Sequence, residues 1–265
     1  MAQTLQEKKP AGAHGVEGIS KHPTGGMTWR RLLSGAALGA AAGLAAISFL
    51  VFKAVVPPVL LMLALLAAGG WLATRAGRVG AIGASLAAAG AAIYAAMGSS
   101  FVIGVLGAPE EPREFIPLVA AFVLSVVVLT SAVVLAVHGR GRAFDRSRAA
   151  SVVAAVTTGL LVVTAAWSLY SGATFESATA ASGDLTVGAT EFAFTPDVLR
   201  APAGEIFVFV DNTGKGLHTF SSEELGFDVA VPAGKAQRAA FTAGAGEYTF
   251  YCKLHPGMEG RLVVY

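Results

Sequence analysis

Cysteine is almost missing from the sequence, since Cys252 is the only one among 265 residues. A single thiol excludes an intramolecular disulfide, a Cys-x-x-Cys-His haem attachment and a zinc site built from several thiolates. The one thiol that is present therefore needs a specific explanation.

Charge is also scarce: 14% of the residues are Asp, Glu, Lys or Arg, against roughly 25% in a typical globular chain. Residues 1–171 hold 13 Lys and Arg against 6 Asp and Glu, whereas residues 172–265 hold 6 against 11. Neither part shows the basic stripe of a nucleic-acid-binding domain, so we expect no nucleic-acid partner. With 54% hydrophobic residues, the composition predicts a chain that lies largely in a membrane and ends in an acidic, more polar domain.

Long apolar runs fill the chain from Leu32 to Ser171, and each is close to the roughly 20 residues that cross a hydrocarbon core. They predict five transmembrane helices, over residues 32–52, 56–73, 79–106, 116–138 and 149–171. Between their flanks these segments contain no Asp, Glu, Lys, Arg or central His. Proton relays, ion sites and bis-histidine haem therefore have no candidate residues in the membrane. The sequence predicts a helical bundle that acts as an anchor or docking surface.

Arginine in the short flanks predicts how the bundle is oriented, because positive residues stay on the cytoplasmic side. The flanks that fall on one side hold Arg30, Arg31, Arg75, Arg78, Arg140, Arg142, Arg146 and Arg148. We expect residues 1–31 to form a disordered cytoplasmic tail and the C-terminal domain to lie outside a prokaryotic plasma membrane.

The chain after the last apolar run has a different pattern. Residues 172–183 are mostly Ser, Ala, Thr and Gly without periodicity, which predicts a flexible linker. From Asp184 to Tyr265, short β-prone runs alternate with turn residues, as in an all-β sandwich. The expected strands are residues 185–189, 205–210, 227–231, 238–242, 248–252 and 261–265.

One short motif carries the chemistry. Cys252, His255 and Met258 follow each other at three-residue intervals, and His218 lies 34 residues before the cysteine. A thiolate, two imidazoles and a weak thioether ligand are the donors of a blue-copper centre. Taken alone, each residue would more often be an ordinary core residue, and zinc is the weaker metal candidate because its structural sites rarely use a thioether.

The residues from Asp184 to the end resemble the cupredoxin family, which includes plastocyanin, amicyanin and pseudoazurin. The segments that carry the resemblance are Glu191 to Pro196, Pro202 to Glu205, Asp211 to Thr213 and Gly246 to Cys252. The resemblance implies a Greek-key cupredoxin sandwich over 184–265, one type 1 copper held by His218, Cys252, His255 and Met258, and single-electron transfer.

The surroundings of the ligands can also be assigned. Thr219, Phe220 and Tyr251 are expected around the centre, with Thr219 a candidate to brace the two ligand segments or simply a strand residue. By the same resemblance, electrons would enter through an exposed edge formed by His255, Pro256 and Leu254.

These observations predict a membrane-anchored electron carrier that turns over no substrate. Its partners would be redox proteins, either a membrane respiratory complex or a soluble carrier. Two alternatives remain: a copper-handling protein that delivers or senses the metal, and an accessory subunit of a membrane redox complex.

Overall fold

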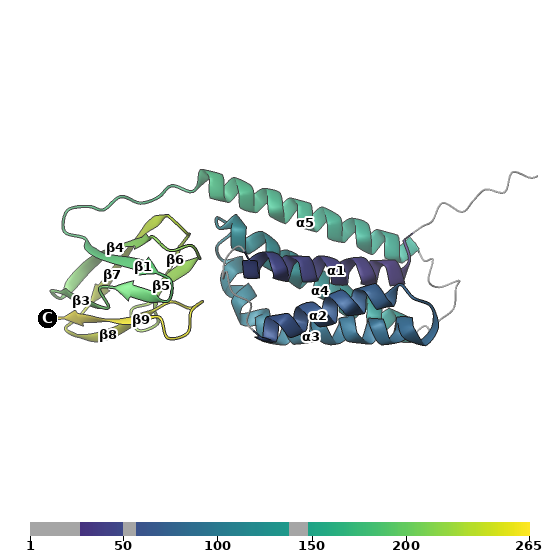
Figure 1. Cartoon of the computed structure of the whole chain (residues 1–265). Coiled ribbons are helices and arrows are strands. Elements are labelled where there is room, and N and C mark those ends of the chain that lie inside the picture. The colour runs from purple at the N-terminus through teal and green to yellow at the C-terminus, as the bar shows by residue number, and fades with distance from the viewer. Residues whose placement is uncertain (1–26, 50–56, 138–147) are drawn as a thin grey trace, which may run out of the picture.

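The computed structural model describes residues 27–49, 57–137 and 148–265 (Figure 1). Most of the expected tail at 1–31 and the expected arginine flank at Arg140, Arg142 and Arg146 lie outside these residues. The described chain has a helical part followed by a β-sandwich, and the sandwich lies beyond one end of the helices.

The helical part is formed by apolar segments whose bounds lie within a few residues of the expected ranges. The helices are α1 (Trp29–Ile47), α2 (Pro57–Ala73), α3 (Gly77–Leu106), α4 (Pro112–Val137) and α5 (Arg148–Thr174). The side chain of Thr28 caps α1 by accepting the N–H of Arg31 at 3.2 Å, as N-cap threonines commonly do.

The five expected membrane spans are confirmed only in part. Within the described residues, three stretches are long and apolar enough to cross a membrane: Gly77–Gly98, Pro112–Val137 and Arg148–Thr174. Helix α2 is apolar but has only 17 residues. Helix α1 begins with Trp29-Arg30-Arg31 and is rich in Ala and Gly, which makes it less hydrophobic than a typical span. The helical part is therefore shown to contain three candidate spans.

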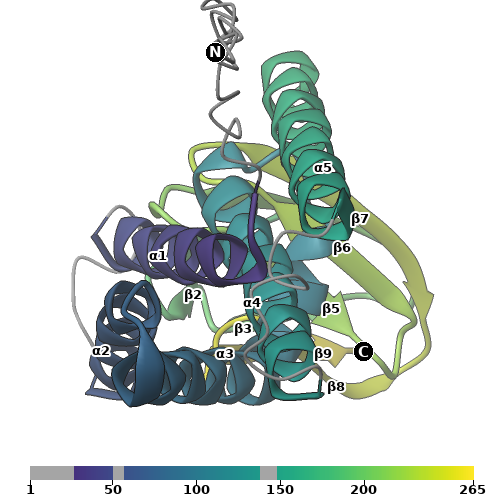
Figure 2. The same cartoon turned by 90° about the vertical axis from the view of Figure 1, so that its right-hand side faces the viewer.

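Small residues explain how the helices approach each other. A β-carbon added at Gly43 would lie 2.8 Å from the carbonyl oxygen of Pro117, so α1 and α4 pack backbone to backbone. Gly69 and Gly83 make the same kind of contact between α2 and α3. Close packing of this kind replaces the hydrophobic driving force that is missing in lipid. Figure 2 shows α5 at the edge of this group, where most of its apolar side chains are exposed.

Two sheets form the sandwich. The first has the order β2 (Ala193–Thr195), β1 (Leu185–Thr190), β4 (Gly204–Asn212) and β7 (Ala236–Ala243). The second has the order β3 (Val198–Ala201), β9 (Glu259–Val264), β8 (Gly246–Tyr251), β5 (His218–Ser222) and β6 (Phe227–Val231). The pairs β1–β4 and β3–β9 are parallel and the others are antiparallel.

The core between the sheets follows from the alternation of buried side chains. Along β4, Ile206, Val208 and Val210 point inward, one residue in two, as the period of a strand requires. Phe220 and Phe250 are each 1% exposed and their ring centroids lie 5.0 Å apart. This aromatic core supports the two strands whose ends carry the expected metal ligands.

The segment between the helices and the sandwich is attached to the sheet. Helix α5 continues to Thr174, three residues past its expected end. Ser177 Oγ accepts the N–H of Ala236 at 2.8 Å, and the N–H of Ala178 donates to the carbonyl of Ala236 at 2.9 Å. Part of the stretch expected to be a flexible linker is thus bonded to the start of β7.

Candidate metal centre

A tight loop between β8 and β9 carries three of the four expected ligands. The N–H of Cys252 donates to the carbonyl of Met258 at 2.9 Å, and the N–H of Met258 donates to the carbonyl of His255 at 3.0 Å. Gly257 has a φ of +84°, a left-handed conformation that favours glycine. The loop therefore holds its shape through its own backbone.

The fourth residue, His218, is the first of β5 and brings its imidazole to the same place. Its Nδ1 lies 3.1 Å from Nδ1 of His255 and 3.9 Å from Sγ of Cys252. The Sγ of Cys252 is 3.4 Å from Nδ1 of His255. Cys252 is 4% exposed, His218 and Met258 are each 1% exposed, and His255 is half-buried. Two imidazole nitrogens and one sulfur therefore point to one small buried volume beside Met258.

Burial keeps both imidazoles neutral. It lowers the pKa of His218 to about 4, with the nearby His255 as a second cause, and it also lowers the pKa of His255. At neutral pH each ring therefore keeps a free lone pair, which is the form that binds a metal.

Thr219 connects the two ligand segments. Its N–H donates to Sγ of Cys252 at 3.3 Å, and its Oγ1 accepts the N–H of Lys253 at 2.9 Å. Ser221 Oγ lies 2.9 Å from Thr219 Oγ1 and 2.7 Å from Asp228 Oδ1. Because an ionised carboxylate only accepts, the Ser221 proton goes to Asp228 and the Thr219 proton to Ser221. The hydroxyl of Thr219 is thus used both as donor and as acceptor.

The other expected neighbours differ in their surroundings. Phe220 packs below the ligands in the aromatic core, whereas the Tyr251 hydroxyl donates to Glu223 Oε1 at 3.1 Å, away from that core. Pro256 is exposed, but Leu254 is only 6% exposed, so the expected contact surface of His255, Pro256 and Leu254 is corrected. Leu254 lies beneath the loop because it packs against α3. The exposed apolar neighbour of His255 is instead Phe192, whose ring meets the imidazole edge to face at 5.0 Å.

Asn212 belongs to the Asp211–Thr213 segment of the resemblance, but the sequence assigned it no role at the site. It is fully buried, its Nδ2 donates to the carbonyls of Gly216 and Val231, and its Oδ1 accepts the N–H of Gly214. These three bonds shape the turn that leads into His218. Asn212 follows an alternating strand and precedes a Gly-rich turn, and this position is the sequence signal that could have indicated its role in shaping the turn.

The donor set fits copper better than zinc. One thiolate, two neutral imidazoles and a buried thioether match a trigonal copper site with a weak axial sulfur, whereas structural zinc sites usually contain more thiolates. The sandwich places His218, Cys252, His255 and Met258 in the arrangement of type 1 copper ligands.

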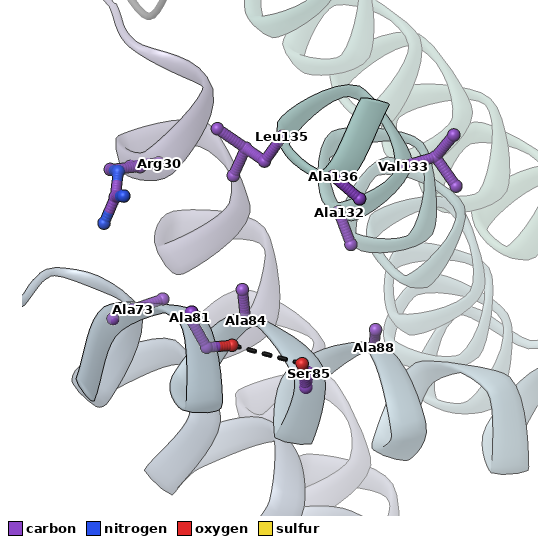
Figure 3. A pocket seen from close by; sticks show the side chains of 11 residues that line it. Arg30, Ala73, Ala81, Ala84, Ser85, Ala88, Ala132, Val133, Leu135 and Ala136 are labelled. Carbon is purple, nitrogen blue, oxygen red and sulfur yellow. Dashed lines mark hydrogen bonds between the residues drawn. The ribbon is translucent and has the colours of Figure 1, made fainter. Parts of the chain in front are cut away.

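A separate cavity of about 590 Å³ lies at the other end of the helical part (Figure 3). It is lined mainly by alanines of α3 and α4, with Arg30 of α1 at one side and the Ser85 hydroxyl donating to the carbonyl of Ala81. None of its lining residues is a metal donor of the copper type, so this cavity plays no part in the metal centre.

Comparisons with known proteins agree with the sandwich. A family model described as the cupredoxin-like domain matches residues 159–264, a range that starts inside α5. No curated protein matches the chain.

Several solved structures are similar to about a third of this chain. A reduced amicyanin mutant is 22% identical, with 34% of this chain and 90% of that chain covered and a TM-score of 0.30. A purple cupredoxin from Nitrosopumilus maritimus is 21% identical, with 31% and 100% covered and a TM-score of 0.28. A copper-containing nitrite reductase from Thermus scotoductus SA-01 is 26% identical over 34% of this chain but only 25% of its own, with a TM-score of 0.27. The family-model match shows a cupredoxin-like domain at residues 159–264, and this domain is preceded by helices that are long and apolar enough to cross a membrane.

Proposed function

We propose that the protein is a membrane-anchored blue-copper electron carrier that exchanges single electrons and turns over no substrate. The observation that carries this proposal is the buried convergence of His218, Cys252 and His255, whose donor atoms lie within 4.8 Å of one another. When bound there, copper would supply reversible one-electron exchange between Cu(II) and Cu(I).

The residues of the chain would keep the ligands in one geometry. Three backbone hydrogen bonds close the Cys252–Met258 loop, and Thr219 ties that loop to the strand of His218. A site whose ligands are held by packing and hydrogen bonds needs little rearrangement when its charge changes, which favours fast electron exchange. The exposed edge beside His255 and Pro256 is the proposed port for a redox partner, either a membrane respiratory complex or a soluble carrier.

The proposed location is the outer face of a prokaryotic plasma membrane. Arg30 and Arg31 lie in the first turn of α1, Arg75 follows α2, Arg78 lies in the first turn of α3, and Arg148 starts α5. These residues therefore gather at the end of the bundle away from the sandwich. A basic end is the cytoplasmic end in most membrane proteins. All five helices would then cross the membrane, with α1 as the least apolar span and α2 as the shortest.

The full chain, purified in detergent and titrated with Cu(II), tests the copper function. We expect an intense thiolate-to-copper absorption band that bleaches on reduction and returns on oxidation over repeated cycles. Cys252→Ser should bind copper without this band. If the wild-type protein binds copper without this band, or releases copper on reduction, the result would contradict electron transfer and support a copper-handling role.

Reporter fusions test the orientation separately. A reporter placed at residue 145 and one at the C-terminus should lie on opposite sides of the membrane. If both reporters lie on the same side of the membrane, the proposed topology is excluded.

A further inference from the structure

Two buried glutamates of the helical part bond to the sandwich. Glu114 of α4, 2% exposed, accepts the N–H of Leu217 through Oε1 at 2.6 Å. Glu111, 5% exposed and just before α4, accepts the N–H of Ala233 through Oε2 at 2.9 Å. Figure 1 shows the sandwich at this end of the helices. These two hydrogen bonds join the two parts of the chain.

The bond of Glu114 ends next to a metal ligand. Leu217 is fully buried and directly precedes His218 at the start of β5. Leaving a buried N–H group without an acceptor is unfavourable, so the position of the Glu114 carboxyl group restricts where the peptide of Leu217 can lie. The backbone of His218 follows this peptide.

A second contact reaches the other ligand segment. Leu254 lies between Cys252 and His255, and a β-carbon added at Gly104 of α3 would be 2.6 Å from Cδ2 of Leu254. The glycine therefore leaves the space in which the leucine side chain sits. Since Leu254 is 6% exposed, the helical part covers this side of the ligand loop.

We propose that Glu114 is a positioning residue of the copper centre, which holds the Leu217–His218 segment from α4 while Gly104 seats Leu254 of the ligand loop. This inference rests on the proposed copper function. It makes the helical part more than an anchor, because both ligand-bearing segments of the sandwich contact it. Without these contacts, all four ligand residues would still be present, but the distances between their donor atoms would be less tightly fixed.

The first experiment changes the carboxylate in the full chain. Glu114→Leu removes the acceptor, and we expect a shifted paramagnetic resonance spectrum of the copper-loaded protein and an approximately tenfold weaker Cu(II) affinity. Glu114→Gln keeps a carbonyl oxygen at the same place and should restore both. Glu111→Leu is the matched control, because it removes an equally buried carboxylate whose partner, Ala233, is not next to a ligand.

Gly104→Ala tests the second contact and does not depend on how Glu114→Leu folds. Alanine favours a helix over glycine, so α3 should remain intact while Leu254 must move. We expect a changed copper spectrum, whereas Gly159→Ala in α5, where a β-carbon meets open space, should leave the spectrum unchanged.

The outcomes separate this inference from the function on which it rests. A wild-type protein without the blue absorption band would overturn the copper function itself. A blue wild-type protein whose spectrum and affinity are the same in Glu114→Leu and Gly104→Ala would overturn the positioning role and leave the function standing.

Discussion

The N–H of Thr219 donates to Sγ of Cys252 at 3.3 Å, although 33 residues separate them in the chain. The sulfur thus has a hydrogen-bond donor from the neighbouring strand, and the same threonine binds the backbone of Lys253. A hydrogen bond to a thiolate is one of the features that tune a copper–thiolate site.

Thr219→Val should destabilise the sandwich. Valine has nearly the same shape as threonine but leaves the N–H of Lys253 without its acceptor, at a cost of about 1–3 kcal/mol. Thermal unfolding of the full chain measures this loss, and Thr219→Ser, which keeps a hydroxyl, is the control. A valine variant as stable as the serine variant would show that the bond contributes nothing.

Met258→Leu should keep copper and raise the reduction potential. The buried methionine is a weak axial donor, and its removal leaves the two imidazoles and the thiolate in place. Redox titration of the copper-loaded protein measures the change, with Met97→Leu, an exposed methionine of α3, as the control. An unchanged potential would mean that Met258 does not bind the metal.

Gly257→Ala should lower the stability of the ligand loop by about 1–2 kcal/mol, the cost of a left-handed conformation for a residue with a β-carbon. The φ of +84° requires this conformation, although a β-carbon there would meet no other atom. A β-carbon at Gly244 would also meet no other atom, and Gly244 does not have a positive φ. Gly244→Ala should therefore cause little loss of stability in chemical denaturation. Equal effects of the two substitutions would contradict this explanation.

Acid should weaken the attachment of the first strand to β7. Asp184 binds the guanidinium of Arg238 through both oxygens, at 2.6 and 2.8 Å, and these bonds lower the pKa of Asp184 below its ordinary value of 3.8. The folded state then binds a proton less readily than the unfolded state, so the stabilisation is complete above pH 3.8 and is lost as the pH falls through the lowered pKa.

The Asp184→Asn variant provides the comparison. Its stability should be lower than that of the wild type near neutral pH, and the difference should shrink as the solution is acidified below pH 3.8. Unfolding temperatures across this range measure the difference. A difference that stays constant with pH would exclude an ionised Asp184 as its cause.

Much of the architecture could be predicted because its signals are local. The apolar runs predict helices from length alone, and β-prone runs between turns predict a sandwich. Cys252, His255 and Met258 stand so close together that chemistry alone suggests copper. Strands β2, β3 and β5 were not predicted. Strands β2 and β3 have only three or four residues, too few for an alternating pattern, and all five residues of β5 are buried, so it shows no alternation.

The joint between the two parts could not be predicted either. Glu114 and Leu217 lie 103 residues apart, and a glutamate in a loop beside an apolar helix ordinarily indicates only a solvated flank. Leu254 was expected on an open surface for a related reason. The sequence of its loop does not predict the contact with Gly104 of α3. Contacts between separate folding units depend on how their surfaces fit, which no local pattern records.

Helix α5 connects the other helices to the sandwich. It packs mainly against α4, it has exposed Val156, Leu160 and Val163 along its length, and the cupredoxin-like match begins within it. At its other end, Ser177 and Ala178 fasten the chain to β7. The sandwich is thus held from two directions: the segment after α5 is bonded to β7, and Glu111 and Glu114, near the start of α4, accept N–H groups of Ala233 and Leu217.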